Sequence, residues 1–200
     1  MLLQPQIVIF CVIYFAIQLS IYANTFWLPT IVRRISGTDD TTVGLLSSLP
    51  WICAVVAMYF TGRASDRVGR SKPLLIASLI VAAAGTFLAA IVSPVLALVV
   101  LCVAAMGFKS ASPLFWTIPQ GSVHPMALAS VVAVVNSLGN LGGFVAPYGF
   151  GLIKQATGQV TWGLYALAAA CLVAAVLVLF VRRDRVVAAP AVSPDVRETL

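Results

Sequence analysis

Six long apolar segments dominate this sequence of 200 residues, and each is about as long as a membrane is thick. They cover roughly residues 7–32, 42–62, 73–92, 95–118, 127–152 and 160–181. A helix needs roughly 20 mostly apolar residues to cross the hydrocarbon core of a bilayer. The segments therefore predict an all-α membrane protein, with a bundle of six transmembrane helices over residues 1–185 and a disordered cytoplasmic tail over 186–200.

The composition excludes several classes of soluble protein. Hydrophobic residues make up 61% of the chain and charged residues only 9%. A soluble domain has about 45–50% apolar and about 25% charged residues, so this chain could not cover a water-facing surface. A soluble enzyme, a disordered regulator and a nucleic-acid binder are excluded for this reason.

The basic residues gather on one side of the predicted membrane. Eight of the twelve lie between the second and third segments or after the sixth: Arg63, Arg67, Arg70, Lys72, Arg182, Arg183, Arg185 and Arg197. Cytoplasmic loops carry the excess of Lys and Arg in membrane proteins. The sequence therefore predicts a multi-pass protein of the cell (inner) membrane with both termini in the cytoplasm. We interpret the net charge of +6 as a mark of membrane topology and of contact with anionic membrane lipid.

No enzymatic, metal or cofactor site is expected. The four cysteines, Cys11, Cys53, Cys102 and Cys171, lie in different apolar segments and have no histidine nearby. They lack the ligand spacing of a zinc site and are interpreted as small buried side chains. His124, the only histidine, lies in a predicted turn without a catalytic partner.

A short segment between the second and third apolar stretches carries the sharpest motif. Gly62 and Gly69 are expected to allow a tight backbone at each end of the turn, and Asp66 to pair with arginines or with a helix N-terminus. A plain basic loop is the alternative interpretation. The segment resembles the loop signature G-x-x-x-D-R-x-G-R-[KR]-[KR] of the major facilitator superfamily, with Ser71 in place of a basic residue. The matching residues are Gly62, Asp66, Arg67, Gly69, Arg70 and Lys72. The resemblance implies a gating loop that latches two halves of a transporter together.

Three further segments, residues 22–29, 113–119 and 136–148, resemble the anion:cation symporter branch of that superfamily. The resemblance implies the C-terminal six-helix half of a twelve-span transporter. It also implies cargo among organic anions such as sugar acids, tartrate and phthalate, and substrate contacts by Trp116 and Asn136. Anchoring at the membrane interface is the competing role for Trp116.

Lys109 is the only charged residue deep inside a predicted span. It shares one helix stripe with Ser112 and Trp116, because the three residues have i, i+3 and i+7 spacing. A charge in this position costs about 2.5–3.5 kcal/mol on insertion scales, which favours an anionic ligand or a water-filled cavity as its partner. Snorkelling of the long side chain to the membrane surface is the alternative.

Uncharged polar residues predict a substrate pathway along two other spans. Asn136 and Asn140 share a face of the fifth span, and Gln18 and Tyr22 share a face of the first. Hydrogen bonding between helices is the alternative role for the amides. The fifth span also carries the small-residue pair Gly139 and Gly143, which permits close helix approach, and Pro147, which is expected to kink the helix.

These features predict transport of a small carboxylate or sugar acid by alternating access, with Lys109, Trp116, Asn136, Asn140, Gln18 and Tyr22 as substrate-binding residues. Proton coupling is expected through a missing N-terminal six-helix half, and the expected partner of this chain is that half or a second copy of the chain. The reason is that all six acidic residues of this chain lie in loops or in the tail. The alternatives are a truncated membrane fragment that does not transport, and a self-assembling channel.

Overall fold

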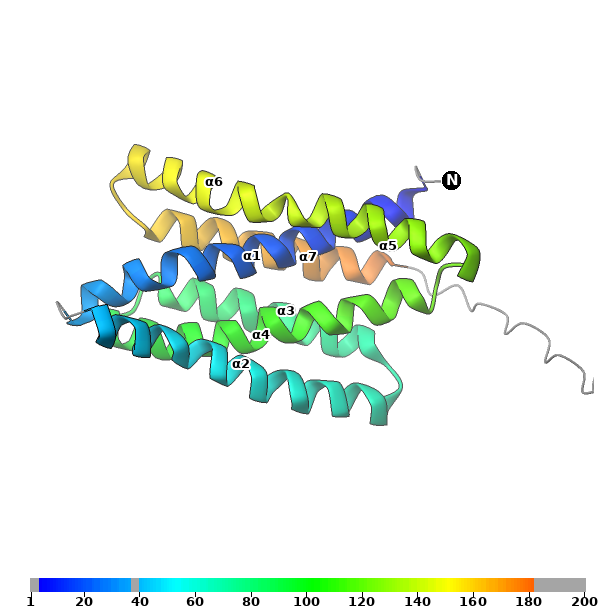
Figure 1. Cartoon of the computed structure of the whole chain (residues 1–200), viewed down its shortest axis with the longest axis horizontal. Coiled ribbons are helices and arrows are strands. Elements are labelled where there is room, and N and C mark those ends of the chain that lie inside the picture. The colour runs from blue at the N-terminus through cyan, green and yellow to red at the C-terminus, as the bar shows by residue number, and fades with distance from the viewer. Residues whose placement is uncertain (1–3, 37–39, 182–200) are drawn as a thin grey trace, which may run out of the picture.

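The described part of the chain is a bundle of seven helices. The computed structural model describes residues 4–36 and 40–181, and Figure 1 shows the helices lying side by side. Their bounds are α1 Pro5–Ser36, α2 Asp40–Val68, α3 Ser71–Ala89, α4 Pro94–Gln120, α5 Pro125–Asn140, α6 Gly142–Thr157 and α7 Thr161–Phe180. The predicted tail at 186–200 lies outside the described residues.

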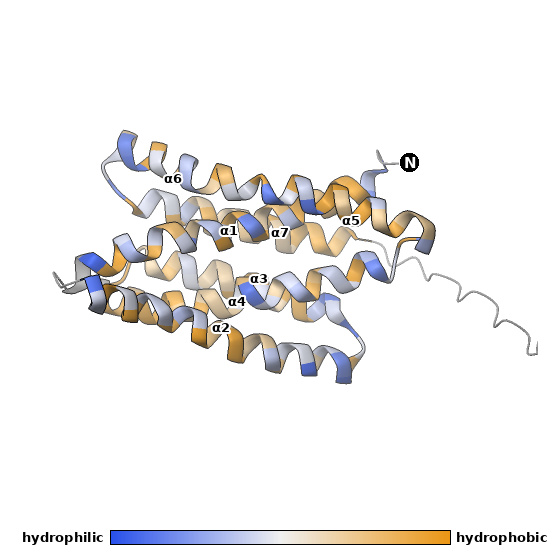
Figure 2. Cartoon of the chain, in the orientation of Figure 1, coloured by the Kyte–Doolittle hydropathy of each residue, from blue (hydrophilic) through white to orange (hydrophobic). Residues whose placement is uncertain are grey.

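Six helical segments of the described chain are long and apolar enough to cross a membrane, since α5 and α6 together form one span. In hydrocarbon every backbone N–H and C=O group needs a partner within the protein, and a continuous helix supplies it. Hydrophilic residues concentrate at the ends of the spans, with a few midway along α1, α4 and the span formed by α5 and α6 (Figure 2). The predicted all-α membrane fold with six transmembrane helices is confirmed.

Two of the turns and the start of the first helix lie at one end of the bundle. The beginning of α1, the α2–α3 turn and the α4–α5 turn lie together at the right of Figure 1. The end of α7 joins them, because the Lys72 ammonium donates a hydrogen bond to the Val181 carbonyl oxygen. At the opposite end, Arg33 of α1 forms an ion pair with Asp40 of α2. The basic α2–α3 turn and the two described chain ends therefore share one side of the bundle.

The spans are buried to different degrees. In the most apolar 18-residue stretch of α1, 61% is buried inside the bundle. The same fraction is 22% for α2 and for the α5–α6 span. Helix α1 therefore lies inside the bundle, while α2 and α5–α6 each expose an apolar surface. Helices α3 and α4 pack closely because Gly85 and Gly107 let their backbones approach each other.

The fifth span has a short break in its helical hydrogen bonding at Leu141, between α5 and α6, where the Leu141 N–H bonds to the Leu138 carbonyl oxygen while the backbone of Leu141 keeps right-handed helical angles. Pro147 lies inside α6, which continues through it to Thr157, and the kink expected there stays a prediction. The break comes directly before the pair Gly142 and Gly143, where the missing side chains weaken the helix. Pro147 is the sixth residue of α6, and it lacks the N–H that would bond to the Gly143 carbonyl oxygen.

Candidate functional site

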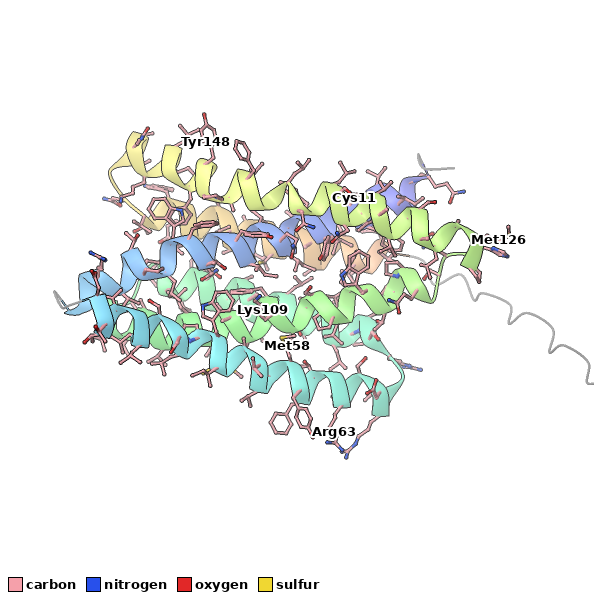
Figure 3. The ribbon with its side chains drawn as sticks, in the orientation of Figure 1. Cys11, Met58, Arg63, Lys109, Met126 and Tyr148 are labelled. Atoms are coloured by element: carbon pink, nitrogen blue, oxygen red, sulfur yellow. The ribbon has the colours of Figure 1, made fainter. Side chains whose placement is uncertain are left out.

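A cavity of about 370 Å³ lies between α1, α2 and α4, near the middle of the bundle (Figure 3). It is lined by Gln18, Ile21, Tyr22, Thr25, Met58, Lys109, Ser112 and Pro113. The i, i+4, i+7 spacing of the α1 polar residues places them on one helix face, which meets the polar stripe of α4. The structure thus brings Gln18, Tyr22 and Lys109 together, in a volume suited to a small metabolite.

The charge of the cavity comes from Lys109. Its side chain is half-buried, and the ammonium nitrogen lies 4.8 Å from the centre of the Trp51 ring in α2. Trp51 in turn makes an edge contact with buried Phe108, with ring centres 6.5 Å apart. The lining contains no carboxylate, so an aromatic face is the described partner of this cation. The sequence did not indicate a role for Trp51, because a tryptophan in an apolar span does not stand out as a polar residue does.

An amide network joins α1 to α5 beside the cavity. The Gln18 amide donates to the Asn140 side-chain oxygen at 2.9 Å, and the Tyr22 hydroxyl donates to the same oxygen at 3.5 Å. The Asn140 amide donates to the side-chain and main-chain oxygens of Asn136, at 3.1 and 2.8 Å. Asn136 and Asn140 do not line the cavity, so within the described chain Asn140 connects helices.

We expect Asn140→Ala to lower stability, because it removes the acceptor shared by Gln18 and Tyr22 and leaves a largely buried amide unpaired. The cost should be about 2 kcal/mol, which corresponds to a melting temperature about 5 °C lower in detergent. Asn136→Ala is the matched control. It removes one side-chain acceptor and keeps the main-chain oxygen, so its effect should be smaller. Equal losses in the two variants would contradict a bridging role for Asn140.

Glycines allow the fifth span to approach α1. A Cβ atom on Gly142 would lie 2.9 Å from the Leu19 nitrogen, and one on Gly143 would lie 3.0 Å from the Tyr22 ring. Gly139 likewise has the Tyr14 ring against it. The break in the fifth span therefore lies in the part of that span that contacts α1, next to the Asn140 bridge. The pair Gly139 and Gly143, predicted from the sequence to permit close helix approach, lies at this contact together with Gly142.

Trp116 does not line the cavity. Its ring packs edge-on against Tyr14, with centres 4.7 Å apart, and against Phe115 at 5.2 Å. Seven residues separate Trp116 from Lys109, which is about 10 Å along a helix. The two residues share the stripe expected from their spacing, but they lie at different depths of the bundle.

The motif between the second and third spans is mostly helical. Gly62, Asp66 and Arg67 lie in the last turns of α2, which continues to Val68. The tight backbone expected at Gly62 is therefore wrong, because this glycine keeps helical geometry. Gly69 does adopt a left-handed conformation, with φ of +62°, and its N–H donates to the Ser65 carbonyl oxygen at 2.9 Å.

The rest of the turn is short and exposed. Arg70 has an extended backbone and directly precedes α3. The hydroxyl groups of Ser65 and Ser71 lie 3.0 Å apart and connect the end of α2 to the start of α3. Asp66, Arg67 and Arg70 are exposed, so their charges remain available to a partner at this end of the bundle.

A second cavity, of about 690 Å³, lies between the beginning of α1 and the beginning of α5. Its walls include apolar side chains such as Phe10 and Val131, with His124 and Ser122 at the α4–α5 turn. The Nδ1 atom of His124 accepts a hydrogen bond from the Met126 N–H at 3.4 Å, so this histidine caps α5. None of the predicted substrate-binding residues lines this second cavity.

Known proteins similar to this chain are membrane transporters. The model of the major facilitator superfamily matches residues 10–199. A quinolone resistance transporter of Acinetobacter baumannii is 34% identical over 89% of this chain, and 41% of its own length is covered. The inner membrane transport protein RhmT of Escherichia coli is 34% identical over 88% of the chain, with 42% of its length covered.

A third relative, from Agrobacterium vitis, carries a name that provisionally assigns it to tartrate transport. It is 35% identical over 90% of this chain, with 40% of its length covered. The chain thus spans about two-fifths of the length of these curated relatives. These relatives fit the resemblance to the anion:cation symporter branch. From its family match and its six membrane spans, the chain is a multi-pass membrane protein that belongs to the major facilitator superfamily.

Proposed function

We propose that this chain takes part in secondary transport of a small organic anion, a carboxylate or a sugar acid. The observation that carries the proposal is the polar cavity between α1, α2 and α4, with the Lys109 ammonium as its charged group. A cation held in a membrane-embedded cavity without a carboxylate partner attracts an anion. Gln18, Tyr22 and Ser112 would then bind hydroxyl or carboxylate oxygens of the same molecule.

The relatives support the same class of cargo. Tartrate, which appears in the name of the Agrobacterium relative, is a hydroxylated carboxylate. It would match a cavity that combines one ammonium with hydroxyl and amide groups. The name of the Acinetobacter relative refers to quinolones, so molecules with larger rings belong in any substrate panel.

We propose further that the chain acts as the C-terminal half of an alternating-access transporter. The relatives are more than twice as long, and such transporters bind substrate between two repeats near the middle of the membrane. The exposed apolar surfaces of α2 and α5–α6 support packing against an N-terminal six-helix half or a second copy. Gly62, Asp66, Arg67, Gly69 and Arg70 would form the gating contact at one end of the two halves.

Coupling to protons would come from the N-terminal half. The six acidic residues of this chain lie outside the middle of the spans, and a proton relay in a transporter commonly needs an intramembrane carboxylate. The positive charge near the α2–α3 turn supports a cytoplasmic position for that end and for both termini in the inner membrane.

Uptake into vesicles tests the proposal. The chain would be produced together with the N-terminal part of its E. coli relative, and labelled tartrate, gluconate and a quinolone would be offered separately. We expect uptake of at least one anion well above that of either part alone, and faster uptake with an inward proton gradient. Uptake no greater than that of uncharged threitol would contradict the proposal.

A further inference from the structure

We propose that Trp51 is a positioning residue that keeps the Lys109 ammonium at the wall of the cavity, ready to receive an anion. The inference rests on the proposed function, because it concerns how that cavity gains its affinity. Its geometric basis is the 4.8 Å distance between the Lys109 nitrogen and the centre of the Trp51 ring.

Lys109 needs such a partner because its side chain is long and flexible. An ammonium inside a membrane protein tends to snorkel toward the nearest aqueous surface, which would take the charge out of the cavity. The cavity lining contains no carboxylate that could hold it. The electron-rich face of an indole attracts a cation, and the attraction grows when water is excluded.

Trp51 is itself well placed to act as a fixed support. It lies in α2, seven residues before the cavity residue Met58, so both occupy the same face of that helix. Its edge contact with Phe108 links it to the buried side of α4. Trp51 does not line the cavity, so it holds the cation without occupying substrate space.

The arrangement leaves the ammonium free to bind substrate. A lysine carries three N–H donors, and a ring face engages only one side of the ammonium. The remaining donors can turn toward a carboxylate in the cavity. Trp51 thus lowers the ordering cost of anion binding, in the way that any preorganised group does.

The first arm of the test needs no transport activity. The purified chain would be labelled with 5-fluorotryptophan, and the Trp51 signal in its fluorine NMR spectrum would be assigned by its loss in Trp51→Phe. We expect Lys109→Met, which removes the charge at similar size, to shift the Trp51 signal and to leave that of Trp162 in place. An unchanged Trp51 signal would overturn the inference, whatever the chain transports.

The second arm measures the concentration of anion that gives half-maximal uptake. Trp51→Leu should raise this concentration about 5- to 30-fold, which matches a desolvated cation–π contact, with little change in maximal rate. Trp51→Phe keeps an aromatic ring, so its half-maximal concentration should lie between those of the unchanged chain and of Trp51→Leu. Trp162→Leu, which removes an exposed indole from α7, is the matched control and should have no effect.

A double substitution separates positioning from structural damage. In a Lys109→Met background, Trp51→Leu should cause no further rise in the half-maximal concentration. An equal rise in both backgrounds, or a lower concentration in Trp51→Leu alone, would overturn the inference. If the unchanged chain takes up none of the anions, the proposed function fails, and the NMR arm still decides whether Trp51 holds the ammonium.

Discussion

Replacing Lys109 by methionine is expected to lower carboxylate uptake about 100-fold. Methionine keeps an unbranched side chain of similar length, so the packing of α4 should survive. The lost interaction is a charge-assisted hydrogen bond from a half-buried ammonium, which is worth about 1.5–3 kcal/mol. Uptake of the labelled anion into vesicles, at a concentration below half-saturation, measures the effect. Lys109→Arg keeps the positive charge and should retain part of the activity.

Lys154 offers a matched control for the loss of a cation. Its ammonium also lies over an indole, 5.1 Å from the centre of the Trp27 ring, but in α6 and outside the cavity. Lys154→Met therefore removes a similar cation–π pair without removing the charge of the site. Normal uptake in Lys109→Met, or an equal loss in Lys154→Met, would contradict the role of Lys109.

Replacing Gly107 by alanine is expected to destabilise the bundle by about 3 kcal/mol, the upper part of the range for overpacking. A Cβ atom on Gly107 would lie 2.5 Å from the Ala82 nitrogen and 2.6 Å from the Ser78 carbonyl oxygen. Both atoms belong to the backbone of α3 and cannot rotate away as a side chain would. The melting temperature in detergent should fall by about 6–12 °C for a chain of this size.

Gly44→Ala distinguishes this clash from a general effect of glycine replacement. Gly44 lies near the start of α2, and a Cβ atom there would have no neighbour within 4 Å. Alanine favours helix over glycine by about 1 kcal/mol, so this variant should be neutral or slightly more stable. If Gly107→Ala melted at the same temperature as Gly44→Ala, the close α3–α4 packing would be contradicted.

Spacing along single helices predicted part of the site. The i, i+4 spacing of Gln18 and Tyr22 and the position of Lys109 within an apolar span were sufficient to nominate three cavity residues. Such patterns predict cavity residues because a helix has one fixed period. Polar side chains facing hydrocarbon also cost free energy, so those inside a span tend to face the protein interior. The same patterns placed Trp116 on the helix stripe of Lys109 but did not give its depth in the bundle. Trp116 does not line the cavity, and its contact with substrate stays a prediction.

Contacts between helices were harder to predict. Nothing in the sequence pairs Trp51 of α2 with Lys109 of α4, because 58 residues separate them. Likewise the Asn140 side chain could face substrate or another helix, and only the position of Gln18 shows that it joins α1 to α5. The break at Leu141 lies beside the close approach of Gly142 to α1, a contact that spacing along one helix does not reveal.

The sequence alone determined that this is a six-span membrane protein. The motif at residues 62–72 indicated its superfamily, and the segments 22–29, 113–119 and 136–148 indicated the branch. Hydropathy suffices for the spans because the bilayer acts on each helix separately, through its length and polarity. The tertiary structure decided which polar residues meet: Gln18, Tyr22 and Lys109 in one cavity, with Trp51 beside the cation. That outcome depends on the rotation and depth of each helix, which close packing between neighbours sets.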